Sequence, residues 1–146
     1  MNKEIITSSP EETEAFGAEV ARYIMNNNNS PKFIALYGDL GVGKTAFVRG
    51  LASVLTPNSI VRSPTFAIVN EYRAQTVSLF HFDMYRIEDE DALYSIGFYD
   101  YLGRGVCVAE WSENIPYALP ESYFRIEISK TSQERPDERK ISSEIV

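Results

Sequence analysis

The segment FIALYGDLGVGKT, residues 33–45, decides the fold class of this chain. Its first part, residues 33–37, is a continuous apolar run of strand length, as expected for a strand buried on both faces of a parallel sheet. Residues 38–45, which we name the glycine loop, follow the pattern Gly-x-x-x-x-Gly-Lys-Thr. After the loop, apolar side chains recur at helical spacing until Pro57. This succession of strand, loop and helix predicts an α/β domain with a phosphate-binding loop.

A loop of this pattern has a separate task for each fixed residue. Its backbone amides curl around phosphate oxygens, Lys44 reaches the β and γ phosphates, and the Thr45 hydroxyl binds Mg²⁺. Glycine is needed because the loop turns tightly and the phosphates approach the backbone closely. At average residue usage a chain this long matches by chance only about once in 200, so the match is informative. The candidate nucleotide-binding residues are Gly38, Asp39, Leu40, Gly41, Val42, Gly43, Lys44, Thr45 and Ala46.

The rest of the chain predicts a single domain, residues 1–146, of the P-loop NTPase-like type, with three layers and a mixed, largely parallel central sheet flanked by helices. Ser9, Pro10 and Glu12 form a capping-box pattern at the start of a helix that ends before Pro31. The other predicted elements are a hairpin of strands 67–72 and 76–82, a helix at 88–96, a buried strand at 106–110, and two edge strands, 123–129 and 140–146, around a charged turn.

Composition and charge limit the function classes. The chain carries 14 basic and 21 acidic residues, and its net charge of −7 has the wrong sign for direct binding of a polyanion, so we expect nucleic acid to be reached only through more basic partners. No apolar run approaches the ~20 residues of a membrane span. The first six residues lack the apolar core of a secretory signal, which predicts a cytoplasmic protein without membrane contact. Cys107, the single cysteine, lies between two valines and is expected to be buried and inert.

Two carboxylates are candidates for catalysis. Nucleotide hydrolysis needs a carboxylate that holds the Mg²⁺ shell or orients water, commonly at the end of a strand beside the phosphate loop. Asp83 and Glu110 each end an apolar run, and ligand crevices of open α/β sheets lie outside the carboxyl ends of the strands. Either residue could instead be a solvated charge, and the residues alone leave open which one is the main catalytic group. The pattern Asn-Lys-x-Asp of guanine recognition is missing, which favours ATP.

Four motifs follow one another in a characteristic order: GDLGVGKT at 38–45, SPTF at 63–66, HFDMYR at 81–86, and Glu110 with Trp111. This order closely resembles the TsaE (YjeE) family over nearly the whole chain. The resemblance implies the ATPase subunit of the bacterial machinery that makes threonylcarbamoyladenosine in tRNA beside the anticodon. It also implies docking on a TsaB–TsaD heterodimer, whose members perform the transfer while hydrolysis of ATP to ADP resets the complex between rounds.

The resemblance further implies roles for single residues. Lys44 would hold the β and γ phosphates, and Thr45 and Glu110 would bind Mg²⁺ directly or through water. Asp83 would assist hydrolysis. The remaining implied positions are a switch segment that senses the γ phosphate, Ser63-Pro64-Thr65, then Trp111 beside the nucleotide and Thr13 in a helix bordering the adenine. A plain turn is the alternative for the switch segment, and core packing is the alternative for the tryptophan.

Ala46 and His81 differ from the pattern expected around them. Family members often carry a second threonine after the loop threonine, whereas this chain has Ala46, so a hydroxyl near the α phosphate is missing. We expect ATP affinity to be weaker by about the net worth of one hydrogen bond, ~1 kcal/mol. His81 lies within an apolar strand and is expected to pack in the core, because the sequence holds no cluster of His or Cys that suits zinc.

Three functions compete at this level. The first is a slow, partner-stimulated ATPase. The second is a small-molecule kinase, for which the chain has little spare sequence to build an acceptor pocket. The third is a nucleotide-gated binding module, whose output is docking, and the sequence does not separate it from the first. The aromatic residues proposed either for partner contact or for the core are Tyr94, Phe98, Tyr99 and Tyr101.

Overall fold

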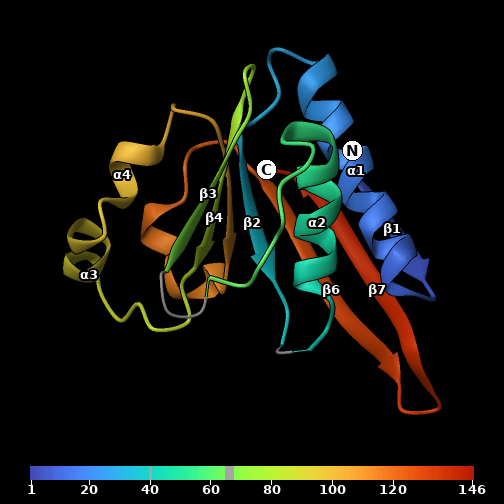
Figure 1. Cartoon of the computed structure of the whole chain (residues 1–146). Helices are drawn as coiled ribbons and strands as arrows, with labels where there is room; N and C mark the ends of the chain where they lie inside the picture. The colour runs from blue at the N-terminus through green and yellow to red at the C-terminus, as the bar shows by residue number, and fades with distance from the viewer. Residues whose placement is uncertain (40, 65–67) are drawn as a thin grey trace.

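The apolar run at 33–37 forms β2 (Phe33–Tyr37), which lies at the centre of a seven-stranded sheet (Figure 1). The computed structural model describes residues 1–39, 41–64 and 68–146. β2 pairs in parallel with β5 (Val106–Glu110) on one side and with β6 (Phe124–Ser132) on the other. β4 (Ser78–Asp83) continues the parallel part beyond β5. The carboxyl ends of these strands therefore meet at one edge of the sheet.

Antiparallel strands complete the sheet on both sides, in the order β1-β7-β6-β2-β5-β4-β3. β3 (Val69–Arg73) forms the predicted hairpin with β4. On the far side, β7 (Arg135–Ile145) pairs with β6 and with β1 (Lys3–Thr7). The mixed sheet with a parallel centre confirms the predicted fold class.

The expected position of the last two strands is wrong. β6 and β7 lie inside the sheet, and the edges of the described sheet are β1 and β3. β1 escaped prediction because it has only five residues and is mostly exposed, so its pairing with β7 was invisible in the local pattern. The charged segment predicted as a turn is also mostly strand, since β6 and β7 extend beyond β2 as a ribbon alongside the glycine loop (Figure 1).

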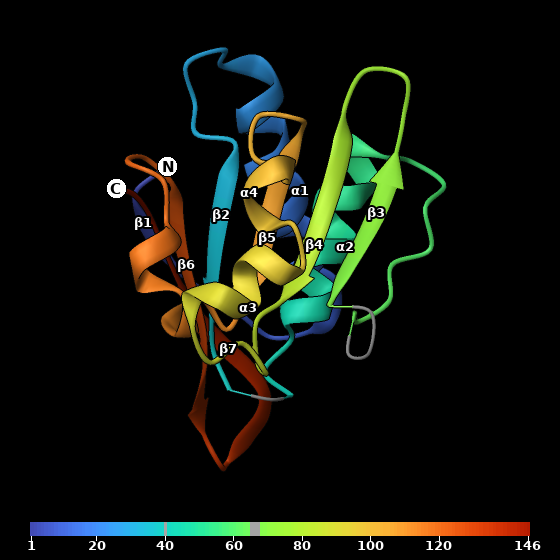
Figure 2. The ribbon, with the colours of Figure 1, turned by 90° about the vertical axis from the view of Figure 1, so that its left-hand side faces the viewer.

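Helices cover both faces of the sheet, which gives the three predicted layers. On one face lie α1 (Pro10–Asn26) and α2 (Lys44–Leu55). Figure 2 shows the opposite face, where α3 (Glu90–Ser95) and α4 (Phe98–Tyr101) lie over the parallel strands. Two short 3₁₀ turns, η1 (Ser112–Asn114) and η2 (Pro116–Ala118), follow β5. In the described part of the chain, no helix has the length and apolar character needed to cross a membrane.

α1 and α2 are locked together by two glycines. A Cβ on Gly17 would overlap the carbonyl oxygen of Phe47, and a Cβ on Gly50 would overlap that of Glu14. The helix backbones therefore touch directly at this crossing, and larger residues would push them apart. Ser9 caps α1 by accepting a hydrogen bond from the Glu12 amide at 3.2 Å, as the capping-box pattern predicts. The close crossing of α1 and α2 fixes α2, and with it the glycine loop, against the rest of the domain.

Each face of the sheet has its own apolar core. The α1/α2 side includes Phe16, Leu36, Phe47 and Phe124, and the α3/α4 side includes Phe33, Phe80, Phe82 and Phe98. Phe98 is thus a core residue, whereas Tyr94 is 64% exposed and lies on the surface. Tyr99 and Tyr101 are half-buried between these extremes. Cys107 is buried as predicted, and burial raises the pKa of its thiol to about 12.

Candidate functional site

The glycine loop joins the end of β2 to the start of α2, where Lys44 is the first helical residue. Gly41 and Gly43 adopt φ values of 77° and 107°, in the region that side chains rarely adopt. A Cβ on either glycine would meet no heavy atom within 4 Å, so the requirement for glycine is conformational. The predicted residue Leu40 lies outside the described residues. In the described part of the loop, glycine therefore stands where the backbone requires it, as the motif predicts.

Gly38 marks the point where the loop touches the sheet. A Cβ there would lie 2.5 Å from the carbonyl oxygen of Ile128 on β6. Its neighbour Asp39 is exposed and, with Val42, lines a hollow of about 740 Å³ that opens beside the loop. Close approach of backbone to backbone therefore holds the start of the loop against β6.

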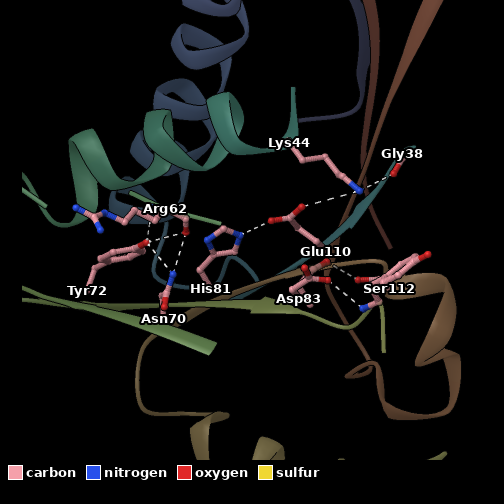
Figure 3. A network of polar contacts seen from close by, with 11 residues as sticks. Gly38, Lys44, Arg62, Asn70, Tyr72, His81, Asp83, Glu110 and Ser112 are labelled. Atoms are coloured by element: carbon pink, nitrogen blue, oxygen red, sulfur yellow. Dashed lines mark hydrogen bonds and ion pairs between the residues drawn. The ribbon is translucent and has the colours of Figure 1, made fainter. Parts of the chain in front are cut away.

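Lys44 is the centre of the site. Its Nζ donates a hydrogen bond to the carbonyl oxygen of Gly38 at 2.6 Å, and lies 3.9 Å from Oε1 of Glu110 (Figure 3). The same ammonium group lies 4.2 Å from the centre of the Trp111 ring. Burial lowers the pKa of Lys44, although the nearby carboxylate of Glu110 acts in the opposite direction. A nearly buried cation is thus held at the mouth of the glycine loop, where an anion would neutralise it.

Glu110 ends β5, and only 5% of it is exposed. Its Oε1 faces Lys44, and its Oε2 lies 2.5 Å from Nε2 of His81 on β4. His81 is fully buried, as its place in an apolar strand predicts, but its hydrogen bond to Glu110 was not predicted. No local signal in the sequence pointed to this bond, because it depends on the register in which β4 pairs with β5.

Asp83 ends β4 and pairs in register with Glu110. Its Oδ1 accepts a hydrogen bond from the backbone amide of Tyr85 at 2.9 Å. Partial burial, followed by the charge of Glu110, raises the pKa of the Asp83 carboxyl, and the hydrogen bond from Tyr85 opposes this rise. The structure therefore brings both predicted carboxylates to the same edge of the sheet, but in different surroundings.

Trp111, which follows β5, and Thr13, on α1, lie next to the glycine loop. Trp111 has φ 58° directly after β5, and its ring lies 5.0 Å from that of Tyr85 as well as over Lys44. Thr13 on α1 is buried and shares a 2.8 Å hydrogen bond with the hydroxyl of Thr7. It lines a hollow of about 140 Å³ with residues 41–43 of the loop. Both residues lie next to the loop, and their contacts with a nucleotide stay predictions.

The predicted metal ligand Thr45 is half-buried in the first turn of α2, and Ala46 beside it is only 3% exposed. The predicted switch segment is described in part: Ser63 is exposed, Pro64 is buried, and Thr65 lies outside the described residues. The Pro64 carbonyl accepts a hydrogen bond from the Ile68 amide at 2.9 Å, and the Ile68 carbonyl accepts one from the Asp83 amide at 2.8 Å. The segment is therefore tied to the strand that carries Asp83.

Two side chains hold the backbone of Arg62, the residue that precedes this segment. The hydroxyl of Tyr72 accepts a hydrogen bond from the backbone amide of Arg62 at 3.0 Å, and the amide of Asn70 donates to the Arg62 carbonyl at 2.9 Å (Figure 3). Ile68, at the other end, has φ 68°, which is a strained conformation for a β-branched residue. Arg62, before the segment, is thus held by side chains, and Ile68, after it, is strained.

Arg139 on β7 is a site residue that sequence reasoning missed. Its Nε donates to the Val42 carbonyl at 2.8 Å, and its Nη2 lies 3.5 Å from the Gly41 carbonyl. It escaped notice because it lies in the charged segment that was read as a turn. No local signal links it to a loop 97 positions earlier in the chain. The guanidinium thus holds the outer side of the glycine loop through backbone carbonyl groups.

Comparisons with known proteins identify relatives of this chain. A family model described as threonylcarbamoyl adenosine biosynthesis protein TsaE matches residues 7–141. A tRNA threonylcarbamoyladenosine biosynthesis protein TsaE from Bacillus subtilis (strain 168) is 39% identical over 137 residues, which cover 93% of this chain and 81% of the relative. A protein of the same name from Aquifex aeolicus (strain VF5) is 41% identical over 113 residues, or 76% of this chain and 77% of the relative.

A solved structure is also similar to this chain. The crystal structure of Bacillus subtilis YdiB has a TM-score of 0.72 and 34% identity with this chain, and the match covers 98% of this chain and 86% of that one. The segment matched by the family model contains the glycine loop, both strand-end carboxylates, Trp111 and Arg139. Sequence match, fold and the expected order of motifs therefore coincide, and the chain belongs to the TsaE family of threonylcarbamoyladenosine biosynthesis proteins.

Proposed function

We propose that this protein is a Mg²⁺-dependent ATP hydrolase that serves the threonylcarbamoyladenosine modification of tRNA next to the anticodon. The observation that carries the proposal is the pair of Lys44 and Glu110, which face each other across 3.9 Å at the mouth of the glycine loop, both nearly buried. Phosphoryl transfer depends on a cation against the phosphates and a carboxylate that holds the metal or the attacking water. This pair supplies both groups in one place.

The loop and Lys44 bind the phosphates in this proposal. Backbone amides of the glycine loop and of the first turn of α2 donate to phosphate oxygens. The Nζ of Lys44, which donates to the Gly38 carbonyl in the free protein, turns to the β and γ phosphates. Burial disfavours the charged form of the Lys44 amine. A phosphate anion next to it offsets this cost of desolvation.

Thr45 and Glu110 hold Mg²⁺ in this proposal. A hydroxyl and a carboxylate are hard oxygen ligands that suit this ion, which takes most of its other ligands from phosphates and water. Among residues 1–39, 41–64 and 68–146, no three His, Cys, Asp or Glu side chains group closely enough to hold a metal by themselves. Bound at Thr45 and Glu110, Mg²⁺ neutralises the negative charge that develops on the phosphates.

Asp83 is the candidate for orienting the attacking water. It lies beside Glu110 at the same edge of the sheet, and its raised pKa brings its carboxyl closer to the pH at which a general base is useful. The segment 63–65 acts as the γ-phosphate sensor, since its neighbour Ile68 is hydrogen-bonded to the backbone amide of Asp83. Trp111 packs against the phosphate-binding lysine, and Thr13 borders the adenine.

The partners in this proposal are the TsaB–TsaD heterodimer, which acts on tRNA in the cytoplasm. The net charge of −7 disfavours direct contact of this chain with RNA, so tRNA is reached through the partners. Hydrolysis of ATP to ADP and phosphate resets the modifying complex between rounds. We expect a slow rate for the chain alone and stimulation by the heterodimer.

The test is phosphate release from ATP by the purified chain, alone and with TsaB and TsaD from the same organism. Lys44→Ala and Glu110→Ala should abolish the stimulated release. Matched controls are Lys32→Ala and Glu121→Ala. Both residues are exposed and precede the amino ends of β2 and β6, whereas the proposed site lies at the carboxyl ends of the strands. The controls should release phosphate at the rate of the unmodified chain.

Two results would contradict the hydrolase proposal. Bound nucleotide with no phosphate release, even with both partners, would indicate a nucleotide-gated binding module. Transfer of the γ phosphate to an added small molecule, with no release in its absence, would indicate a kinase.

A further inference from the structure

The chain contains one histidine, His81, and it is completely buried next to the proposed catalytic carboxylate. Its Nε2 lies 2.5 Å from Oε2 of Glu110, while Nδ1 has no hydrogen-bond partner among the described residues. A buried polar group without a partner costs stability, and the neighbours of His81 on β4, Phe80 and Phe82, are apolar. The packing of the core alone therefore does not account for a histidine here.

The register of the sheet explains how the contact arises. His81 pairs with Val108, and Asp83 pairs with Glu110, on the neighbouring parallel strands β4 and β5. Residues two apart on a strand point to the same face, so His81 and Glu110 are diagonal neighbours on the α2 side of the sheet. The imidazole therefore contacts the Glu110 carboxylate from the side opposite Lys44 and Gly38 (Figure 3).

The two oxygens of Glu110 have different partners. Oε2 meets Nε2 of His81 at 2.5 Å, and Oε1 points toward Nζ of Lys44 at 3.9 Å. A glutamate side chain has three rotatable bonds, and ordering it costs free energy when a ligand must do so. A hydrogen bond at one oxygen removes that cost in advance, because it fixes the plane of the carboxylate and leaves the second oxygen directed at the loop.

We propose that His81 is the positioning residue for Glu110: its Nε2–H donates to Oε2 and holds Oε1 toward Lys44 and the incoming metal–nucleotide complex. The role of Oε1 toward Mg²⁺ rests on the proposed function, whereas the hydrogen bond and the fixed carboxylate do not. His81 itself touches neither phosphate nor metal. It acts on the reaction through Glu110.

A spectroscopic test examines the hydrogen bond without any nucleotide. Because His81 is the only histidine, its ring signals in a ¹⁵N-histidine-labelled sample need no assignment. We expect the ring proton on Nε2, shifted downfield and slow to exchange with water. In Glu110→Ala that proton should move upfield and exchange faster, while the surface control Glu121→Ala should leave it unchanged. A ring proton on Nδ1 instead of Nε2, or a signal that Glu110→Ala does not change, would overturn the proposal.

A kinetic test examines the consequence for the reaction. His81→Gln keeps an amide donor near the position of Nε2, whereas His81→Leu removes it while retaining an apolar side chain. For His81→Leu we expect kcat to fall about 10- to 100-fold and the Mg²⁺ requirement to rise, with the KM for ATP within about twofold. His81→Gln should recover most of the loss. A folded His81→Leu protein with the original kcat and Mg²⁺ dependence would overturn the proposal.

A double substitution separates positioning from general damage to the fold. In a Glu110→Ala background, His81→Leu should cause no further loss of the Mg²⁺-dependent part of ADP affinity, because its effect passes through Glu110. Additive losses in the two variants would contradict the proposal. If the unmodified chain releases no phosphate, the hydrolase proposal fails alone, since the ring-proton comparison needs only the folded free protein and still decides the role of His81.

Discussion

The two sides of the glycine loop are held by different kinds of contact. On the side of β5, charged side chains meet one another: Lys44 faces Glu110, which is bound by His81. On the side of β6 and β7, the loop is held through its backbone, because Arg139 donates to the Val42 carbonyl and Gly38 packs against the Ile128 carbonyl. One side presents chemical groups to a ligand, and the other sets the shape of the loop.

This difference suggests a division of labour within one small site. Glu110, on the β5 side, is proposed to hold the metal, so its loss should reduce turnover. Contacts on the β7 side only hold the backbone amides in place, so their loss should weaken nucleotide binding. Substitutions on the two sides therefore test whether catalysis and affinity are separable.

The largest effect is expected for Glu110→Gln. The amide keeps the size of the side chain but lacks the negative charge, so we expect kcat for ATP hydrolysis to fall at least about 100-fold. ADP affinity measured without Mg²⁺ should change little, because the phosphates contact the loop and Lys44. Steady-state kinetics and calorimetric titration check the two parts. Equal losses of kcat and of metal-free ADP affinity would show that the β5 side also sets the shape of the loop.

A smaller effect, on affinity, is expected for Arg139→Ala. Removing a charged donor from a backbone carbonyl costs about 1.5–3 kcal/mol, so we expect ATP to bind at least about tenfold more weakly. The kcat at saturating ATP should stay within about threefold. Arg135→Ala, which alters an exposed arginine on the same strand, is the control and should bind ATP as the unmodified chain does. A fall of kcat with unchanged affinity would reverse the assignment of the two sides.

Ala46 lies between the two sides, in the first turn of α2. A substitution there is expected to strengthen ATP binding and not to weaken it. Ala46→Thr would add the missing hydroxyl, and we expect ATP to bind about fivefold more tightly, equivalent to ~1 kcal/mol. Because Ala46 is only 3% exposed, the added atoms must also fit. Ala46→Val adds a similar volume without the hydroxyl, so it measures the cost of fitting the larger side chain alone. Identical ATP affinities in the two variants would indicate that no hydrogen bond to phosphate forms.

The smallest effect concerns Asp83 and is measured without ligand. Its pKa is raised in the folded protein by burial and by Glu110, while Lys44 and His81 oppose the rise. The folded state therefore favours the protonated carboxyl, and the unmodified chain loses this stability as pH rises through the raised pKa. Asp83→Asn does not titrate and should be more stable at pH 7.

Thermal unfolding at a series of pH values checks this expectation. The partial exposure of Asp83 screens its charge, so we expect a rise in Tm of only about 1–3 °C at pH 7. The difference in Tm between the two proteins should vanish below the ordinary aspartate pKa of about 3.9, where neither Asp83 nor the asparagine is charged. A destabilised Asn variant at pH 7 would show that the ionised carboxylate is favoured in the fold.

Sequence patterns predicted the elements that depend on neighbouring residues. The capping pattern at Ser9 begins α1, and the apolar run at 33–37 forms β2. They failed where pairing partners are distant: β1 was missed, and β6 and β7 were placed at the edges. A short polar strand has no local signal strong enough to reveal it, because its stability comes from hydrogen bonds to β7 at the other end of the chain.

The sequence by itself determined the glycine loop, the strand before it, the helix after it, and the ending of two buried strands in Asp83 and Glu110. These features follow from local periodicity and from the backbone freedom of glycine. Only the tertiary structure decided that His81 binds Glu110 and that Arg139 binds Val42, across 29 and 97 positions of the chain. The physical reason is strand register, since a shift of one residue would turn each of these side chains to the opposite face of the sheet.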